Sequence, residues 1–338
     1  MWNELTKDEI KKVVAIIRAS ANIQDRDASG KASAEFTKAL ETPIRQVLLS
    51  GDTLLNVFER LDYSDENRIE IPIDLIAPGD EDNFYAYVHP GEGSIPERRV
   101  EGDYIMIPTY EIANAIDVPL RIVRNANWDI VRRMMEILES GFVKKRNDDG
   151  WQTVLAAGVD RNIVVNDANA AAGQLTPRLI VLMQTFMRRN GGGNAGSPFR
   201  SKLTHLYVSP EAHMDIRTWG LDLIPDDART RIFYAQDGSQ DLINVFGVNL
   251  VAMDELGESQ EYQNYFGTNL AGSMASGDNE IVIGLDRQRN DSFVNPVRRD
   301  VEVFEDNTTH RRGIFSLYGN GEHGFAVLDS RRTLLGSL

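Results

Sequence analysis

The sequence predicts an α+β protein, in which strands and helices alternate without a regular βαβ repeat. Residues 61–76 and 98–108 carry apolar side chains at alternate positions, as strands with one buried face do. Residues 127–145 and 174–190 instead repeat apolar side chains every three to four positions, which is the period of an amphipathic helix. Because strands follow these helices in an irregular order, a parallel sheet built from βαβ units is not expected.

Composition indicates a globular protein and excludes several kinds of function. The 338 residues are 42 % hydrophobic and 26 % charged, which is typical of a chain with a packed core. The lack of cysteine excludes disulfides, thiolate metal sites and cysteine nucleophiles, and it suits a reducing cytosol. The net charge of −15 argues against a nucleic-acid reader, because phosphate backbones are bound by clustered Lys and Arg. We expect neither a signal peptide nor a membrane span, since no apolar run approaches about 20 residues.

A long acidic hairpin is the most informative feature of the chain. Residues 52–104 hold two alternating strands around a polar tip, with 14 acidic against 4 basic residues. The apolar residues that share a strand face are Ile69, Ile71, Ile73 and Leu75 in the outgoing strand, and Ile105 and Ile107 in the return strand. An isolated two-stranded ribbon is only marginally stable in water. We therefore expect another copy of the chain to cover this apolar face.

The hairpin tip carries residues that we expect to contact a neighbouring subunit. Three aromatic residues lie within four positions, namely Phe84, Tyr85 and Tyr87. Exposed aromatic side chains are costly in a monomer and are favoured as interface anchors. Charged residues follow at Glu92, Glu97, Arg98 and Arg99. Either these are ordinary solvated charges, or complementary charge on a neighbour uses them to set the register of the contact.

The predicted helix at 127–145 is the candidate partner of this hairpin. Between residues 119 and 150 seven basic and five acidic residues make the region net positive. The basic residues assigned to the contact are Arg132, Arg133, Lys144 and Lys145, with the two lysines at the expected end of the helix. Asn127 is its predicted cap, and the predicted apolar side consists of Ile130, Met134, Ile137 and Leu138.

Caps and apolar spacing predict the remaining helices. Thr6 and Glu9 form a capping-box pattern before a helix at 7–20, and a short helix is expected at 43–50. Thr176 is the predicted cap of the helix within 174–190. Its predicted inward residues are Leu179, Met183, Phe186 and Met187. Residues 203–220 are predicted to form a strand and a short helix, and strands are expected at 107–123, 231–236, 243–253, 279–286, 300–305, 313–318 and 324–329.

The order of these parts resembles the major capsid proteins of tailed double-stranded DNA phages, whose fold is named after the phage Hong Kong 97. The most specific stretch is the end of the chain, EIVIGLD and then DSFVNPVRRDVEVFEDNTTHRRGIFSLYGNGEHGFAVLDSRRTLLGSL. It is similar to the closing strands and tail of that family. The resemblance implies an N-terminal arm at 1–51, an extended β-hairpin loop at 52–104, a peripheral domain with a long spine helix at 105–155 and 285–338, and an axial domain at 156–284.

The resemblance also implies a function and partners. The chain would form the hexamers and pentamers of an icosahedral head shell, enclosing double-stranded DNA without binding it specifically and without contact with a membrane. It would be a virion protein, assembled in the host cytoplasm, with a portal and a cement or decoration protein as further partners. Because only about fifty residues precede the hairpin, scaffolding is expected from a separate protein. No Lys lies between Lys38 and Lys144, so the covalent cross-link that the family prototype makes through this loop is excluded.

Several short motifs suggest other chemistry but have a structural explanation. GNGEHG at 319–324 fits G-x-G-x-x-G, yet strand-like sequence flanks it and a hairpin turn is predicted. Residues 25–36 resemble a calcium loop, but Phe36 stands where a bidentate Glu is needed, so a linker is predicted. The acidic run 80–82 is predicted to be a solvated tip. The histidines are His89, His205, His213, His310 and His323, and their spacing fits no metal site. We assign no catalytic residue, cofactor or metal.

Two alternatives remain open at this level. An encapsulin-like compartment shell would share the fold, although encapsulins are usually shorter. A soluble metal-dependent enzyme would use the Asp-rich loops, although no ligand spacing supports it.

Overall fold

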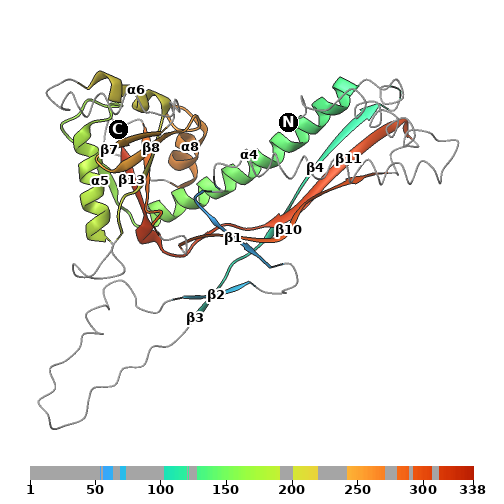
Figure 1. The fold of residues 1–338 in the computed structure, drawn as a ribbon, viewed down its shortest axis with the longest axis horizontal. Coiled ribbons are helices and arrows are strands. Elements are labelled where there is room, and N and C mark those ends of the chain that lie inside the picture. The colour runs from blue at the N-terminus through green and yellow to red at the C-terminus, as the bar shows by residue number, and fades with distance from the viewer. Residues whose placement is uncertain are drawn as a thin grey trace, which may run out of the picture. The chain divides into compact units, whose positions relative to one another are not determined.

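The computed structural model describes residues 54, 56–63, 69–73, 103–119, 121, 128–190, 201–219, 242–270, 280–288, 292–306 and 312–338. The chain divides into two compact units, each assembled from segments that are distant in sequence. The first unit consists of Met1–Ile69, Ile107–Asp149 and Asn295–Phe325, and the second of Glu70–Met106, Gly150–Val294 and Ala326–Leu338. Both contain strands and helices, so the predicted α+β class is confirmed (Figure 1).

A long sheet forms the frame of the first unit. Its strands are β1 (Glu59–Asp62), β10 (Phe293–Glu305), β11 (Ile314–His323) and β4 (Tyr110–Pro119), in that order. β11 and β4 pair antiparallel along their whole length, from Tyr110 opposite His323 to Pro119 opposite Ile314. The sheet therefore joins the segment that follows the hairpin to the last part of the chain.

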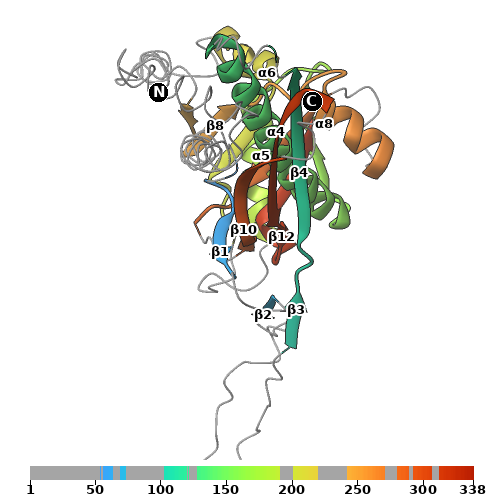
Figure 2. The same ribbon diagram turned by 90° about the vertical axis from the view of Figure 1, so that its right-hand side faces the viewer.

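Helix α4 (Trp128–Asp160) runs along this sheet, and its residues up to Asp149 belong to the first unit (Figures 1 and 2). The buried ring of Phe142 lies against Gly319 of β11, where a Cβ atom would be only 2.8 Å from the ring. Phe315 and Leu317 share the strand face of Gly319 and are buried, whereas Tyr318 points the other way and is exposed. The helix thus covers one face of the sheet.

The long helix differs from its prediction in length and in one apolar position. It was expected to end at Lys145 but continues to Asp160. The buried side chains of Trp151 and Leu155 explain the extension, because their burial outweighs the cost of about 1 kcal/mol that Gly150 imposes inside a helix. Met134 and Leu138 are buried as predicted, but Ile137 is exposed.

A six-stranded mixed sheet forms the centre of the second unit. Its order is β5 (Val164–Asn166), β13 (Thr333–Ser337), β9 (Ile281–Leu285), β6 (His205–Val208), β8 (Val248–Ala252) and β7 (Leu242–Val245). β13 pairs parallel with β5, and β6 pairs parallel with β8, while the other neighbours are antiparallel. Short β12 (Ala326–Val327) pairs with Phe293 and Val294, and a 3₁₀ turn (Ser330–Arg332) precedes β13.

Helices α5 (Pro177–Asn190) and α6 (Pro210–Thr218) contribute to the main core of the second unit. Thr176 caps α5 as predicted, since its Oγ1 accepts a hydrogen bond from the Leu179 amide. Met183 and Met187 are buried, but Phe186 is exposed, so its predicted inward position was wrong. On the opposite sheet face the ring of Trp151 packs edge-on against Tyr207, and α8 (Glu261–Tyr265) leads into a π-helical turn (Phe266–Leu270).

The predicted hairpin pairing is confirmed at its base. β2 (Glu70–Ile73) and β3 (Asp103–Met106) pair antiparallel, with Ile71 directly opposite Ile105. The predictions for residues 7–20, 25–36, 43–50, 80–82 and 231–236 lie outside the described residues.

The GNGEHG motif is not the predicted turn. Gly319 to His323 lie inside β11, which pairs with both β4 and β10. A Cβ atom would clash with Phe142 at Gly319 and would approach Val301 to 3.0 Å at Gly321. The glycines therefore allow close packing of the strand and do not bend it.

Candidate subunit interface

The base of the hairpin exposes apolar side chains on both faces of β3. Tyr104 and Met106, on one face, are 63 % and 58 % exposed, and Ile105 on the other face is also exposed. One step toward the body of the chain, Ile69 and Ile107 are buried, and the Ile107 amide donates a hydrogen bond of 3.2 Å to the Ile69 carbonyl. The ribbon is thus anchored at its root and leaves apolar surface uncovered just beyond it. Tyr104 and Met106 were not singled out from the sequence, although alternation in YIMIP places both on one face.

The predicted hairpin contacts lie beyond this described base. Phe84, Tyr85, Tyr87, Glu92, Glu97, Arg98 and Arg99 fall outside the described residues and stay predictions, as does the side chain of Arg132. Arg133, Lys144 and Lys145 are on α4, and all three are exposed.

Lys145 already has an acidic partner within the first unit. Its Nζ lies 2.7 Å from Oδ1 of Asp149, one helical turn along α4. The hydroxyl of Tyr110 donates a hydrogen bond of 2.7 Å to the other oxygen of this carboxylate. Burial, together with Asp149, raises the pKa of Tyr110. Lys145 therefore helps to fix α4 to β4, which weakens its predicted role in binding a neighbour.

A buried carboxyl group on α4 is a second feature that the sequence did not reveal. Glu139 is only 3 % exposed, and its Oε1 accepts no hydrogen bond within the described part of the chain. Burial raises the pKa of this carboxyl to about 7, and the neighbouring charge of Glu136 contributes in the same direction. Glu139 is thus a group on the long helix that titrates near neutral pH.

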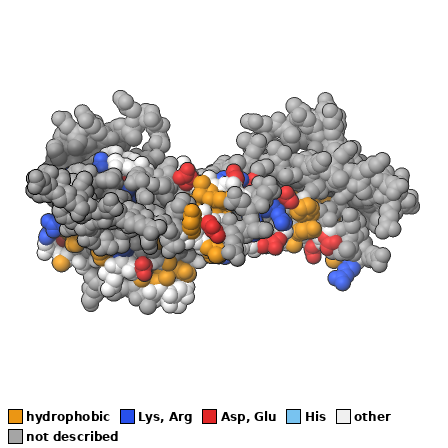
Figure 3. Space-filling view, turned by 90° about the horizontal axis from the view of Figure 1, so that it is seen from below, with side chains coloured by type: hydrophobic (Ala, Val, Ile, Leu, Met, Phe, Trp, Pro, Cys, Tyr) orange, Lys and Arg blue, Asp and Glu red, His pale blue; other side chains and the backbone are white. Residues whose placement is uncertain are grey.

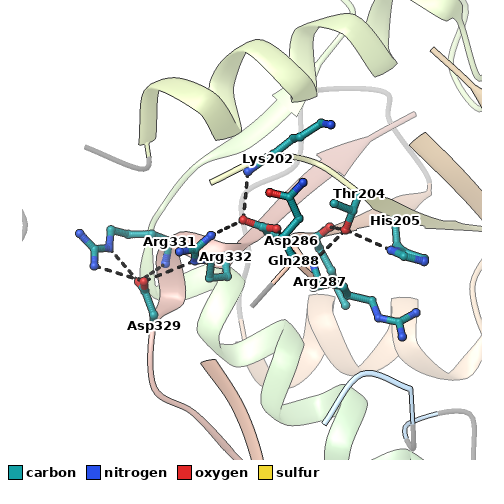
Figure 4. A network of polar contacts seen from close by, with 10 residues as sticks. Lys202, Thr204, His205, Asp286, Arg287, Gln288, Asp329, Arg331 and Arg332 are labelled. Carbon is teal, nitrogen blue, oxygen red and sulfur yellow. Dashed lines mark hydrogen bonds and ion pairs between the residues drawn. The ribbon is translucent and has the colours of Figure 1, made fainter. Parts of the chain in front are cut away.

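The polar cluster at the end of β9 has a structural role (Figure 4). Asp286 is fully buried, and its carboxylate accepts hydrogen bonds of 3.0 Å from the amides of Lys202 and Gln288 and a further bond from the guanidinium of Arg332. The Arg332 side chain is also buried, so each charge is neutralised by the other. The cluster ties the segment before β6 to β9 and β13.

Two of the described histidines, His205 and His323, are held in contacts with neighbouring side chains. His205 lies between Oγ1 of Thr204 and Nδ2 of Asn249, and burial together with Arg287 lowers its pKa to about 4. His323 is buried between the rings of Tyr110 and Phe325. Across the described ranges no group of His, Asp and Glu is arranged to hold a metal ion.

On the face drawn in Figure 3, exposed hydrophobic side chains form small groups that acidic side chains border. None of the described helices is both long and apolar enough to cross a membrane. Small exposed apolar groups are normal on a protein surface, so this face by itself assigns no partner.

The fold has counterparts among solved structures of phages and related particles. A structure from Microbacterium phage Oxtober96 has a TM-score of 0.53 at 12 % identity, covering 85 % of this chain and 90 % of that one. The capsid of a native GTA particle has a TM-score of 0.52 at 12 % identity, with coverage of 85 % and 90 %. A structure from Mycobacterium phage Bobi has a TM-score of 0.51 at 15 % identity, with coverage of 85 % and 89 %. No protein-family model and no curated protein sequence matches.

These likenesses extend over most of the chain and show its fold. The chain has the fold of tailed-phage major capsid proteins, which the order of elements in its sequence predicted. At identities of 12 to 15 % the likeness concerns the fold alone.

Proposed function

We propose that the chain is a major capsid protein whose copies form the hexamers and pentamers of an icosahedral shell around double-stranded DNA. The observation that carries this proposal is the anchored ribbon with exposed Tyr104, Ile105 and Met106, on a fold shared with a solved capsid. A monomer gains nothing from exposing such a strand, whereas a second copy can bury it. The role is structural, and it uses no catalytic group.

The contact that we propose joins the hairpin of one copy to the long helix of another. Residues 52–104 carry a net charge of −10, while α4 presents the exposed cations Arg133 and Lys144. Complementary charge selects the orientation, and burial of the β3 side chains supplies most of the affinity. Many such weak contacts in a closed shell act together, so the assembly is stable although each contact is small.

The anatomy proposed for this role follows the resemblance. Residues 1–51 are the N-terminal arm, 52–104 the extended loop, 105–155 with 285–338 the peripheral domain, and 156–284 the axial domain. Scaffolding, portal and cement proteins are the further partners of a virion component assembled in the host cytoplasm. Because the shell protein is acidic, its wall does not retain the DNA that is driven inside.

Deletion of residues 77–97 tests the proposal. Electron microscopy of the purified protein should show closed, DNA-sized shells for the wild-type chain and only soluble capsomers or monomers for the deletion. Normal shells from the deletion would show that the hairpin is not needed for assembly. Small cargo-filled shells from the wild type would favour a compartment protein, and a small monodisperse particle would favour a soluble enzyme.

Point substitutions locate the contact more finely. Tyr104→Ser with Met106→Ser, and separately Tyr85→Ser with Tyr87→Ser, should reduce the yield of shells. His205→Ala is the control, because the His205 ring makes its contacts within its own unit. Equal yields from all three variants would contradict the proposed contact.

A further inference from the structure

The second unit exposes an apolar patch beside its edge strand. The two-residue turn between β7 and β8 consists of Phe246 and Gly247, whose φ angles are 52° and 77°. A left-handed conformation is unusual for a bulky residue, and Phe246 is 52 % exposed. Asn or Asp, whose short polar side chains tolerate this conformation, would avoid both costs. An aromatic side chain is therefore displayed where local structure favours a small polar one.

Helix α5 extends this patch and adds a positive charge. The side-chain amide of Gln184 donates a hydrogen bond of 2.9 Å to the Phe246 carbonyl, which joins the turn to the helix. Val181 and Arg188 share the helix face of Gln184, because they lie three and four positions away. Val181 is 45 % exposed and Arg188 is exposed. We call Val181, Arg188 and Phe246 the turn patch.

An acidic surface lies at the other end of β8. The segment that follows this strand, residues 253–261, has no Lys or Arg. Four of its side chains are acidic and exposed, namely Asp254, Glu255, Glu258 and Glu261. Helix α6 adjoins it, since a Cβ atom at Gly257 would lie 3.4 Å from Oε2 of Glu211. Met214, one turn along α6 from Glu211, is exposed. We call these six side chains, with Glu211 and Met214 included, the acidic patch.

The two patches are complementary but cannot meet within one copy. Both display apolar side chains beside charges, and the charges have opposite sign. Five residues of β8 separate the turn from the acidic segment, which at about 3.3 Å per residue is about 16 Å. A contact between unlike patches on two copies is head-to-tail, and such contacts close into rings when the rotation allows.

We propose that the turn patch of one copy binds the acidic patch of the next copy within a ring of subunits. This inference rests on the proposed function, because it identifies the partner as a second copy of the chain. Opposite charges set the direction of the contact, and Phe246, Val181 and Met214 supply its apolar part.

Charge reversal on the full-length chain tests the pairing. Arg188→Glu and Glu258→Arg should each lower the yield of shells at least about tenfold, because like charges then meet across the contact. The double variant restores opposite charges and should recover shells. In an equimolar mixture of the two single variants, each copy meets an opposite charge only on a copy of the other variant, so alternating rings with an even number of subunits should appear in analytical ultracentrifugation. Rings of five cannot alternate, so closed shells should not form.

Arg189→Glu is the matched control. It makes the same charge change in the last turn of α5, at an exposed position one residue beyond Arg188, so its side chain lies about 100° around the helix from that of Arg188. Its shells should form as in the wild type. Normal shells from Arg188→Glu or Glu258→Arg would overturn the inference, as would failure of the double variant to recover. If the wild-type chain itself forms no shells, the proposed function fails, which is a different result.

Discussion

Replacement of the buried carboxyl on the long helix should change how stability depends on pH. In the folded chain the pKa of Glu139 is raised from 4.5 to about 7, mainly by burial. Because the folded value is the higher one, the group stabilises the fold while it is protonated, and that contribution is lost as pH rises through about 7. Glu139→Gln keeps the size of the side chain and removes the titration.

The expected size follows from the two pKa values. Each factor of ten in proton affinity is worth about 1.4 kcal/mol, so a fully ionised Glu139 destabilises the fold by about 3 kcal/mol. Part of this cost is already present at pH 5, where the unfolded carboxyl is mostly ionised. Between pH 5 and pH 8 the wild-type chain should therefore lose about 2.5 kcal/mol more stability than Glu139→Gln.

Urea unfolding followed by tryptophan fluorescence measures this difference. The midpoint is recorded from pH 5 to pH 8 at two protein concentrations, so that any contribution of assembly is separated from that of folding. Glu136→Gln, at an exposed position on the same helix, is the control and should keep most of the pH dependence. If the free energy of unfolding changed equally with pH in the wild type and in Glu139→Gln, the buried carboxyl would not be the source of the pH dependence.

Three further predictions concern packing and hydrogen bonds, and urea unfolding measures each of them. Gly319→Ala should destabilise the first unit by about 1 to 3 kcal/mol because a Cβ atom would overlap a buried ring, whereas Gly267→Ala, in open space, should not. Asp286→Asn removes the nearer of the two carboxylates beside the buried Arg332, leaving Asp329 at 3.7 Å, and should cost about 3 kcal/mol, the lower end of the range for breaking a buried pair; an unchanged midpoint would contradict the buried pair. Thr176→Ala removes the cap of α5 and should cost about 1 kcal/mol; a loss below about 0.5 kcal/mol, the lower limit for such caps, would contradict a stabilising role of this hydrogen bond.

Local sequence patterns gave correct predictions for features that depend on a single helix or strand. Thr176 begins α5 as predicted, because a cap depends on residues only three positions apart. Apolar alternation around Ile71 and Ile105 predicted the two strands of the hairpin, because the period of a strand is independent of its surroundings, whereas their position opposite each other comes from the structure.

Local patterns failed where distant segments decide the outcome. Lys144 and Lys145 indicated a helix end, yet the burial of Trp151 carries α4 further. The spacing of Phe186 fits an inward position, but helix spacing cannot show how wide a face the neighbouring sheet covers.

The candidate interface likewise has features that the sequence predicts and features that only tertiary contacts decide. The hairpin and its acidity follow from the sequence, as do the contacts predicted at its tip. That Lys145 is engaged by Asp149 depends on how α4 lies on β4, and no spacing rule contains that information.

By itself the sequence determined the α+β class, the acidic ribbon and the order of elements shared with phage capsids. Only the tertiary structure decided that GNGEHG is an interior strand, that Glu139 is buried, and that the turn and acidic patches lie at opposite ends of β8. The physical reason is the separation along the sequence over which each effect acts. Periodicity and capping act over a few residues, whereas close approach, desolvation and the spacing of surfaces depend on segments more than a hundred positions apart, such as Phe142 and Gly319.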